Sequence, residues 1–369
     1  MYELKVCSFN ICKLSKANMS LKKNGSILKK IIKEGKYSII ALQEVIDYEG
    51  VMLLAKELGP TWTGAYGRPP KMNYNDPEWK KSGKYATEGY GFLWDESKVI
   101  CATTEILDSF GNSYIPKRYR SYAPRIINQD SNEMIFDRQF NLIRNPYYGR
   151  FTPRTAEGTS RLFEIRIINA HIIEGINTTS QELFDSQEYE EEEEVSINEV
   201  QLRKKEFRAL SNSILPSVDN RIYGRNPLKQ TDVKTGLNHY TFLMGDYNLN
   251  LKREENPTAA TLASNEEHIC LLGAHPREIV TFQENRTTIK KSASSEDVMN
   301  NKHCLNNYDH FTYDILKVDD LMIEIDNQWD DPIKDYYANE DNPCKKYYEE
   351  VSDHLPIGMK ITYGRNPVF

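Results

Sequence analysis

The chain contains 369 residues, of which 39% are hydrophobic, and carries a formal net charge of -7. A chain of this size and composition can bury a large core, which excludes a disordered protein. The net negative charge excludes a polyanion binder that relies on overall charge alone. No run of 18 or more apolar residues occurs, so the sequence predicts no membrane-spanning helix.

The N-terminus and the cysteines point to a cytoplasmic protein with buried thiols. Residues 2–6 follow Met1 and lack the basic head and the apolar centre of a signal peptide, although a chain with its leader removed would look the same. The six cysteines are scattered and form no CxxC pair. This spacing is typical of neither a disulfide framework nor a zinc site.

The first 58 residues predict a strand, a helix, a second strand and a second helix. Residues 2–9 alternate apolar and polar side chains up to Asn10, and apolar residues recur at helical spacing over 25–33. A second apolar strand at 37–42 leads to Glu44. This order implies parallel strands with a right-handed crossover, so Asn10 and Glu44 are expected at one sheet edge, where α/β sheets bind ligands. Each residue alone is also explained by a helix cap or a turn.

An aromatic and basic segment follows the second helix, which we place at 47–58. Residues 60–88 interleave Trp and Tyr with Lys and Arg. Such a segment suits stacking on sugars or bases beside phosphate contacts, or a solvated loop packed by its own aromatic residues. Residues 89–94 and 98–105 predict a pair of strands, with Glu88 at the foot of the first.

The middle of the chain combines long polar segments with one clear strand. Residues 109–148 have few periodic apolar positions and predict a long surface loop. Residues 161–171 predict a strand that ends at His171. Residues 172–238 predict a second long loop, which includes an amphipathic helix at 200–215.

Charge is unevenly distributed in these loops. Residues 117–166 contain ten Lys or Arg and five acidic residues, whereas residues 181–199 contain nine acidic residues and no basic one. The first segment predicts a locally basic face. The acidic run at 188–194 is explained as a solvated segment, and alternatively as a mimic of nucleic acid that docks a basic regulatory partner or restrains the site.

Residues 240–250 form an apolar run that stops at Gly245 and presents Asp246 and Asn248. An apolar run ended by glycine predicts a buried strand that meets the surface. Two oxygen-bearing side chains two residues apart point the same way along an extended backbone, which suits a divalent ion or a phosphate-bound water. Asp and Asn also cluster at strand ends simply to form turns.

The last third of the chain predicts a helix and three strands, with a polar segment between the second and the third strand. The helix is placed at 257–263 and the strands at 279–282, 316–325 and 355–363. Asp353 and His354 precede the last strand. Neither an internal repeat nor a linker is evident, so we expect residues 1–369 to form a single domain with long surface loops near 109–148 and 172–238.

Five motifs occur in a fixed order, each at the edge of a predicted strand: Asn10, Gln43-Glu44, His171, Gly245-Asp246-Tyr247-Asn248 and Ser352-Asp353-His354. This ordered set resembles the endonuclease/exonuclease/phosphatase superfamily, and the resemblance spans residues 8–357. It implies an α/β fold, namely a four-layer α/β/β/α sandwich of two packed mixed sheets flanked by helices.

Within this superfamily the chain is most similar to the deoxyribonuclease I branch. Glu88 before an aromatic strand resembles the glutamate that supports the middle-strand histidine of that branch, and Arg144 and Arg150 resemble its phosphate-contacting arginine segment. Asp309 resembles the aspartate that supports the last histidine, with Asp314 as a second candidate.

Three features depart from that branch. Tyr85 lies near the place of a groove-inserting tyrosine but at a different spacing, the loops are longer than a minimal member needs, and the paired cysteines of secreted members are not evident. We therefore keep Tyr85 as a candidate substrate-binding residue beside Arg144 and Arg150.

The expected metal ligands are Glu44, Asn10 and Asp353. Oxygen atoms of this kind are preferred by Mg²⁺, which retains several waters, and Mn²⁺ or Ca²⁺ can substitute or assist. Zinc is not expected, because the sequence lacks a compact Cys/His cluster.

The expected catalytic residues are all placed near strand ends: His171, His354, Asp246, Glu88, Asp309 and Asn248. The two histidines, each beside a carboxylate, can donate or accept protons across a scissile phosphate, and the sequence leaves open which one is the acid. A carboxylate beside an imidazole favours its protonated form. Asp246 is expected to orient or deprotonate water, and Asn248 to donate a hydrogen bond to a phosphoryl oxygen.

These residues predict a Mg²⁺-dependent phosphodiesterase, specifically a DNA endonuclease of low sequence specificity. The same catalytic core acting on RNA, or on a phosphoinositide or phospholipid phosphoester, is the alternative. A catalytically silent binding module on the same scaffold is a third, less favoured interpretation, because every polar position that catalysis needs is present.

Overall fold

The computed structural model describes residues 2–69, 88–108, 111–113, 142, 144–154, 163–172, 203, 206–221, 238–252, 266–268, 279–282, 286–325 and 331–364. Tyr85, the acidic run at 188–194 and the predicted helix at 257–263 lie outside these residues. Over the described part of the chain, no helix combines the length and the apolar character that a membrane span requires.

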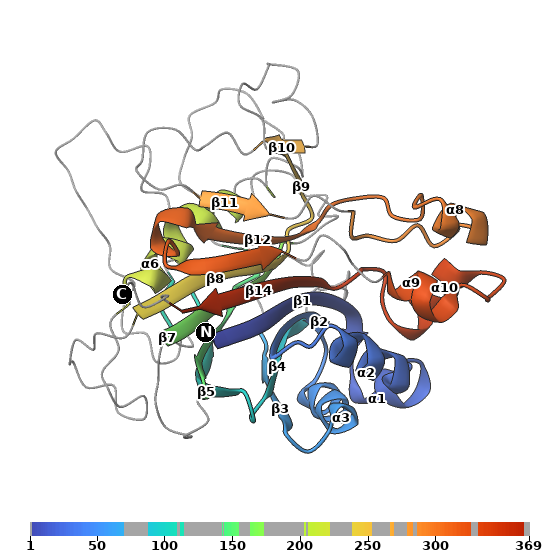
Figure 1. The fold of residues 1–369 in the computed structure, drawn as a ribbon, viewed down its shortest axis with the longest axis horizontal. Coiled ribbons are helices and arrows are strands. Elements are labelled where there is room, and N and C mark those ends of the chain that lie inside the picture. Colours follow the sequence, from blue (N-terminus) through green and yellow to red (C-terminus); the bar gives the residue numbers. More distant parts are fainter. Residues whose placement is uncertain are drawn as a thin grey trace, which may run out of the picture.

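The first sheet contains six strands in the order β13-β14-β1-β2-β4-β3 (Figure 1). Its strands are β1 (Tyr2–Leu14), β2 (Ile39–Val45), β3 (Trp62–Gly67), β4 (Gly89–Asp95), β13 (Leu321–Ile325) and β14 (Ile357–Tyr363). β1 and β2 are parallel, as predicted, with Asn10 opposite Gln43. β1 pairs with β14 in the antiparallel direction, so the first and last strands lie together in the middle of the sheet.

The second sheet also contains six strands, in the order β11-β12-β8-β7-β6-β5. Its strands are β5 (Val99–Ile106), β6 (Tyr147–Pro153), β7 (Phe163–His171), β8 (Asn238–Asp246), β11 (Ile279–Phe282) and β12 (Asp309–Asp314). β7 and β8 are parallel, and His171 lies opposite Asp246 at their ends. A small additional sheet pairs β9 (Asn250–Lys252) with β10 (Glu266–His268).

Helices cover the outer face of each sheet. α1 (Lys16–Leu21), α2 (Gly25–Glu34) and α3 (Tyr48–Leu58) lie beside the first sheet, whose core is completed by apolar residues of α8 (Ser295–Met299), α9 (Pro332–Tyr337) and α10 (Pro343–Glu350) (Figure 1). The π-helix η3 (Leu210–Ile214) and α6 (Leu215–Asp219) cover the second sheet. A third core lies between the two sheets. The predicted four-layer α/β/β/α sandwich is therefore confirmed.

The inward faces of both sheets carry apolar side chains that give way to polar ones at one end. In β8, Tyr240, Phe242 and Met244 are buried between the sheets, and Asp246 is the next residue on that face. The same alternation, which places every second residue on one face, brings further polar residues to that end of the inter-sheet core: Asn10, Glu88, His171 and Asp309. Strand periodicity thus assembles the site.

The prediction that residues 89–94 and 98–105 form a strand pair is wrong. β4 pairs with β2 and β3, whereas β5 pairs with β6 in the other sheet. The turn between them is held by Asp95, which accepts hydrogen bonds from the Ser97 backbone N–H and hydroxyl. The chain passes here from the first sheet to the second. The two sheets pack on each other through the core between them, where Phe92 of β4 contacts Phe151 of β6.

Five of the described strands were not predicted, namely β3, β6, β9, β10 and β12, and several predicted boundaries differ. β3 lies within the segment 60–88 that was predicted as a loop, and it was missed because its sequence is rich in glycine and lacks apolar alternation. β6 begins in the segment predicted as a long surface loop, and β12 coincides with a segment that was interpreted only as a family motif. The predicted strand at 316–325 starts only at Leu321, after the 3₁₀-helix η4 (Ile315–Lys317). β1 continues beyond Asn10, through left-handed backbone at Cys12 and Lys13.

Three buried polar side chains join the two sheets beneath the polar end. Gln43 Nε2 donates hydrogen bonds to Asn169 Oδ1 at 2.7 Å and to Ser8 Oγ at 3.2 Å. Asn169 Nδ2 donates to the Leu42 carbonyl at 2.9 Å, which is a second hydrogen bond between β7 and β2. All three side chains are fully buried. Each therefore depends on its partners for hydrogen bonding.

We expect Gln43→Leu to lower the free energy of unfolding by about 1–3 kcal/mol, because it removes the hydrogen bond that Asn169 Oδ1 accepts from Gln43 in the core. Urea denaturation measures this change. The Gln43→Leu/Asn169→Leu double variant should be less destabilised than the sum of the two single variants, since neither partner is then left alone. Strictly additive effects would contradict a direct interaction between the two side chains.

Candidate active site

A β-bulge turns Glu44 toward the polar end of the inter-sheet core. The pairing register of β2 with β4 shifts between Leu42 and Val45, and Glu44 has a φ of 56°. Leu42 belongs to the helix-covered core, so regular alternation would have placed Glu44 on that same outer face. Bulges re-aim side chains in this way, and left-handed backbone at a non-glycine residue concentrates at functional sites.

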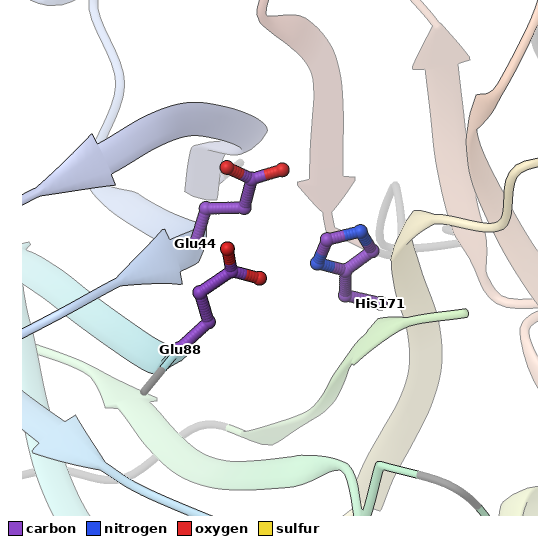
Figure 2. A group of neighbouring side chains, drawn as sticks. All are labelled: Glu44, Glu88 and His171. Atoms are coloured by element: carbon purple, nitrogen blue, oxygen red, sulfur yellow. The ribbon is translucent and has the colours of Figure 1, made fainter. Parts of the chain in front are cut away.

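Glu44, Glu88 and His171 form a cluster in which one ligand atom of each lies within 4.8 Å of the others. Figure 2 shows the two carboxyl groups next to one another and facing the imidazole ring. Burial raises the pKa of Glu44 to about 6, helped by Glu88 and Asp353 and opposed by Asn10 and His354. The excess of negative charge and the oxygen donors fit a divalent cation.

Asn10 connects the two halves of the site. Its Nδ2 donates hydrogen bonds to Glu44 Oε1 at 3.2 Å and to Asp246 Oδ2 at 2.9 Å. Its Oδ1, the atom that a metal would need, accepts from the Cys12 N–H at 3.1 Å. The arrangement positions two carboxylates through Asn10, and the ligand role of Asn10 stays a prediction.

Asp353 acts on the Glu44 side of the site. Its charge contributes to the raised pKa of Glu44, but its oxygens are not among the atoms that cluster within 4.8 Å. Glu88, which the sequence assigned to the support of His171, clusters with both Glu44 and His171.

Asp246 lies between the two histidines. Its Oδ2 is 3.7 Å from His171 Nε2 and 3.5 Å from His354 Nε2, and it also accepts the Asn10 hydrogen bond. Burial raises the pKa of Asp246 to about 7, although His354 and the hydrogen bonds from Asn10 and Asn248 oppose this rise. The raised pKa makes this carboxylate a stronger base than an ordinary aspartate, which suits proton exchange.

His354 is held by Asp309. The distance from His354 Nδ1 to Asp309 Oδ2 is 2.7 Å, so the structure places Asp309, rather than Asp314, against this ring. Burial would lower the pKa of His354, but the carboxylates of Asp309 and Asp246 outweigh burial and raise it well above the usual value. His354 is therefore a protonated imidazolium at neutral pH, with Nε2 directed at Asp246.

His171 is in the opposite protonation state. Arg144 Nη1 donates to His171 Nδ1, and Arg144 Nη2 donates to Glu88 Oε2 at 2.9 Å. Burial lowers the pKa of His171 well below the usual value, and the charges of Arg144 and His354 lower it further. Arg144 thus bridges the predicted Glu88–His171 pair. The neutral ring carries its proton on Nε2, which faces Asp246.

The structure does not bring Arg150 to the site. Tyr147 and Phe151 of β6 point into the core between the sheets, so Arg150 points to the opposite face. There its Nε donates to Glu164, and its exposed fraction is 5%. A period-2 count along the strand would have shown this, because Arg150 is adjacent to the inward-facing Phe151.

Asn248 anchors the turn after β8. Its Nδ2 donates to the Ile172 carbonyl at 2.7 Å, and its backbone N–H donates to Asp246 Oδ1 at 2.9 Å. Its φ is 49°, so the backbone is left-handed and not extended here. The expectation that Asn248 points the same way as Asp246 along an extended strand is therefore wrong.

Two further residues position the catalytic groups and were not assigned roles from the sequence. The Ser352 hydroxyl donates to the Asn10 carbonyl at 2.6 Å and accepts from the His354 N–H at 3.2 Å. The Tyr90 hydroxyl accepts from the His171 N–H at 3.2 Å. Tyr90 follows Glu88 by two residues, so strand periodicity was the signal that places it on the same face.

Gly245 permits the close approach of β8 to β7. Its φ is 145°, and a Cβ added there would lie 1.8 Å from the Ala170 carbonyl oxygen. A side chain is therefore excluded beside Asp246 and His171.

No protein-family model matches the chain, and no curated protein is similar to it. Solved structures are similar to it in fold. An endonuclease/exonuclease/phosphatase family protein from Bacteroides thetaiotaomicron is 9% identical, with 98% of each chain covered and a TM-score of 0.48. TDP2 from D. rerio with a single-strand DNA product is 14% identical, covering 98% of this chain and 99% of that one, with a TM-score of 0.45. ANGEL2, a 2',3'-cyclic phosphatase, is 11% identical, covering 98% and 95%, with a TM-score of 0.47. The superfamily that the motifs resemble is thus represented among the structures similar to this chain.

Proposed function

We propose that this chain is a divalent-metal-dependent phosphodiesterase that cleaves DNA with little sequence specificity. The observation that carries the proposal is the position of Asp246, within 3.7 Å of both His171 Nε2 and His354 Nε2 and joined through Asn10 to Glu44. A buried base, a charged acid and a group of hard oxygen ligands are the components that phosphodiester hydrolysis requires.

Asp246 and His354 divide the proton transfers. Asp246 accepts a proton from the attacking water, and His354 donates a proton to the leaving oxygen. The two groups are 3.5 Å apart, so the proton on Asp246 returns to His354 after cleavage and restores the starting state. Asp309 keeps His354 charged until it donates.

His171 and Arg144 supply hydrogen bonds and positive charge. The neutral His171 ring presents Nε2–H, which donates to a phosphoryl oxygen. Arg144 fixes this tautomer and adds positive charge where negative charge develops. We assign His171 as a hydrogen-bond donor and not as the acid.

Glu44 and Glu88 would hold the cation, with Asp353 close by. We propose Mg²⁺, which Mn²⁺ or Ca²⁺ can replace, because the donors are oxygen atoms of carboxylates. When bound, the cation supplies charge that stabilises the phosphoryl group during the reaction.

DNA is preferred over other phosphoesters because Glu88 and Arg144 resemble the deoxyribonuclease I branch and flank the reacting group. The test is hydrolysis of supercoiled plasmid, single-stranded RNA and phosphoinositide vesicles, each in Mg²⁺ and again in EDTA. We expect plasmid nicking that EDTA abolishes. Faster RNA or lipid hydrolysis would favour the alternative substrates, and hydrolysis of none would refute the proposed function.

A further inference from the structure

The turn after β8 fixes the carboxylate of Asp246. Asp246 Oδ1 accepts a hydrogen bond from the Asn248 N–H at 2.9 Å. The other oxygen, Oδ2, is thereby left facing the Nε2 atoms of His171 and His354. Asn248 has left-handed backbone, with a φ of 49°, which a residue other than glycine keeps only where its surroundings hold it. The orientation of Asp246 therefore depends on the contacts that hold this turn.

His310 of β12 is one of those contacts. Its Nε2 lies 3.0 Å from the Leu249 carbonyl oxygen and 2.8 Å from the Asn307 carbonyl oxygen. Both partners are acceptors, so Nε2 carries the proton and donates. The ring thus links the residue after Asn248 to the segment that leads into Asp309.

Adjacent residues of β12 serve the two proton-transfer groups. Asp309 contacts His354, and His310 lies on the opposite face of the strand, because successive side chains of a strand alternate. On that face the His310 ring packs against Tyr247, with the two ring centroids 5.4 Å apart. One strand therefore contacts both the acid and the turn that carries the base.

The environment of His310 suits a fixed hydrogen-bond donor. Its side chain is fully buried, and burial lowers its pKa to about 4, so the ring is neutral at the pH of an activity assay. A ring that only filled space beside Tyr247 could be replaced by phenylalanine. A ring that donates to the Leu249 carbonyl could not, because phenylalanine has no donor.

We propose that His310 is a positioning residue for the general base, whose Nε2–H anchors the Leu249 carbonyl and so keeps the Asn248 N–H on Asp246 Oδ1. This inference rests on the proposed function, because it takes Asp246 to be the base. Without the anchor the turn relaxes, and the carboxylate can rotate away from the attacking water. A misplacement of about 1 Å can cost about 10²-fold in rate.

The test uses two amides that differ in reach. The amide nitrogen of glutamine extends about as far as Nε2 of histidine, whereas that of asparagine is one bond shorter. We expect His310→Asn and His310→Phe to lower kcat for plasmid nicking in Mg²⁺ by about 10²-fold and to change KM by less than about twofold, because His310 touches no reacting group. His310→Gln should keep kcat within about threefold of the wild type.

Thr241→Val is the matched control for loss of a buried hydrogen bond. It removes the bond of 2.9 Å from Thr241 Oγ1 to Asp219 Oδ1, which lies in the same sheet but away from the turn. We expect this variant to lose stability and to keep the kcat of the wild type. If His310→Phe does not fold, the two amide variants carry the same comparison.

Hydrogen exchange measured by NMR tests the anchor without an activity assay. The Asn248 amide should exchange at least about tenfold faster in His310→Asn and His310→Phe than in the wild type, because the turn opens locally. In His310→Gln and Thr241→Val it should exchange at the wild-type rate.

The outcomes separate the anchor from the proposed function. Full kcat in His310→Phe or His310→Asn, or a loss in His310→Gln as large as theirs, would overturn the inference. Unchanged exchange of the Asn248 amide in an active enzyme would contradict only the role of His310. If the wild type nicked no plasmid, the proposed function itself would fail.

Discussion

His354→Gln should lower kcat by about 10²–10⁴-fold, the usual contribution of a positioned proton donor. Glutamine keeps a hydrogen-bond donor of similar reach but cannot transfer a proton. His171→Gln should retain much more activity than His171→Ala, because the proposed role of His171 is to donate a hydrogen bond through Nε2. Alanine at either position should leave no more than a few per cent of the activity.

The pH dependence of kcat separates these roles further. Asp309 raises the pKa of His354, so Asp309→Asn should lower it. The acid is then lost at a lower pH, and the alkaline decline of kcat should begin at a lower pH than in the wild type. His239→Gln is the matched control, since His239 lies at the start of β8, at the far end from Asp246. Similar losses for His171→Gln and His354→Gln would contradict the division of roles.

The sequence predicted the fold more completely than the local geometry of the site. Asn10, His171 and Asp246 could be placed because each follows a predicted apolar strand, whereas Asp309 lies on β12, which was not predicted, and was assigned from the resemblance to a family. A bulge reverses the direction of the Glu44 side chain. The parallel order of the first two strands placed Glu44 at the sheet edge, but nothing in the sequence indicated the bulge.

The remaining differences arise from contacts between residues that are distant in sequence. Arg144 was expected to contact phosphate, and nothing local indicates that it hydrogen-bonds to both Glu88 and His171. The state of His171 follows from that contact, because a neighbouring guanidinium has the opposite effect to a carboxylate on an imidazole pKa. The sequence alone could have excluded Arg150 from the site, because strand alternation places it on the face opposite to its neighbour Phe151.

Glu44→Gln should abolish both metal binding and hydrolysis. Burial and the neighbouring carboxylates raise the pKa of Glu44 to about 6. The metal-free folded protein therefore binds more protons than the unfolded chain between the ordinary pKa of 4.5 and about 6, and its stability falls as pH rises through that window. A bound cation favours the ionised carboxylate and offsets this loss.

Thermal unfolding with and without Mg²⁺ tests this relation without an activity assay. At about 100 times its dissociation constant, Mg²⁺ should stabilise the wild type by about 2.7 kcal/mol, and the shift in Tm should increase from pH 5 to pH 7. Glu44→Gln should show no shift and should be more stable than the wild type in EDTA at pH 7, because an unfavourable buried charge is gone. Glu49→Gln, at an exposed position of α3, is the control and should respond like the wild type. If Glu44→Gln showed the full Mg²⁺-induced shift in Tm, the cation would have to bind at a site other than Glu44.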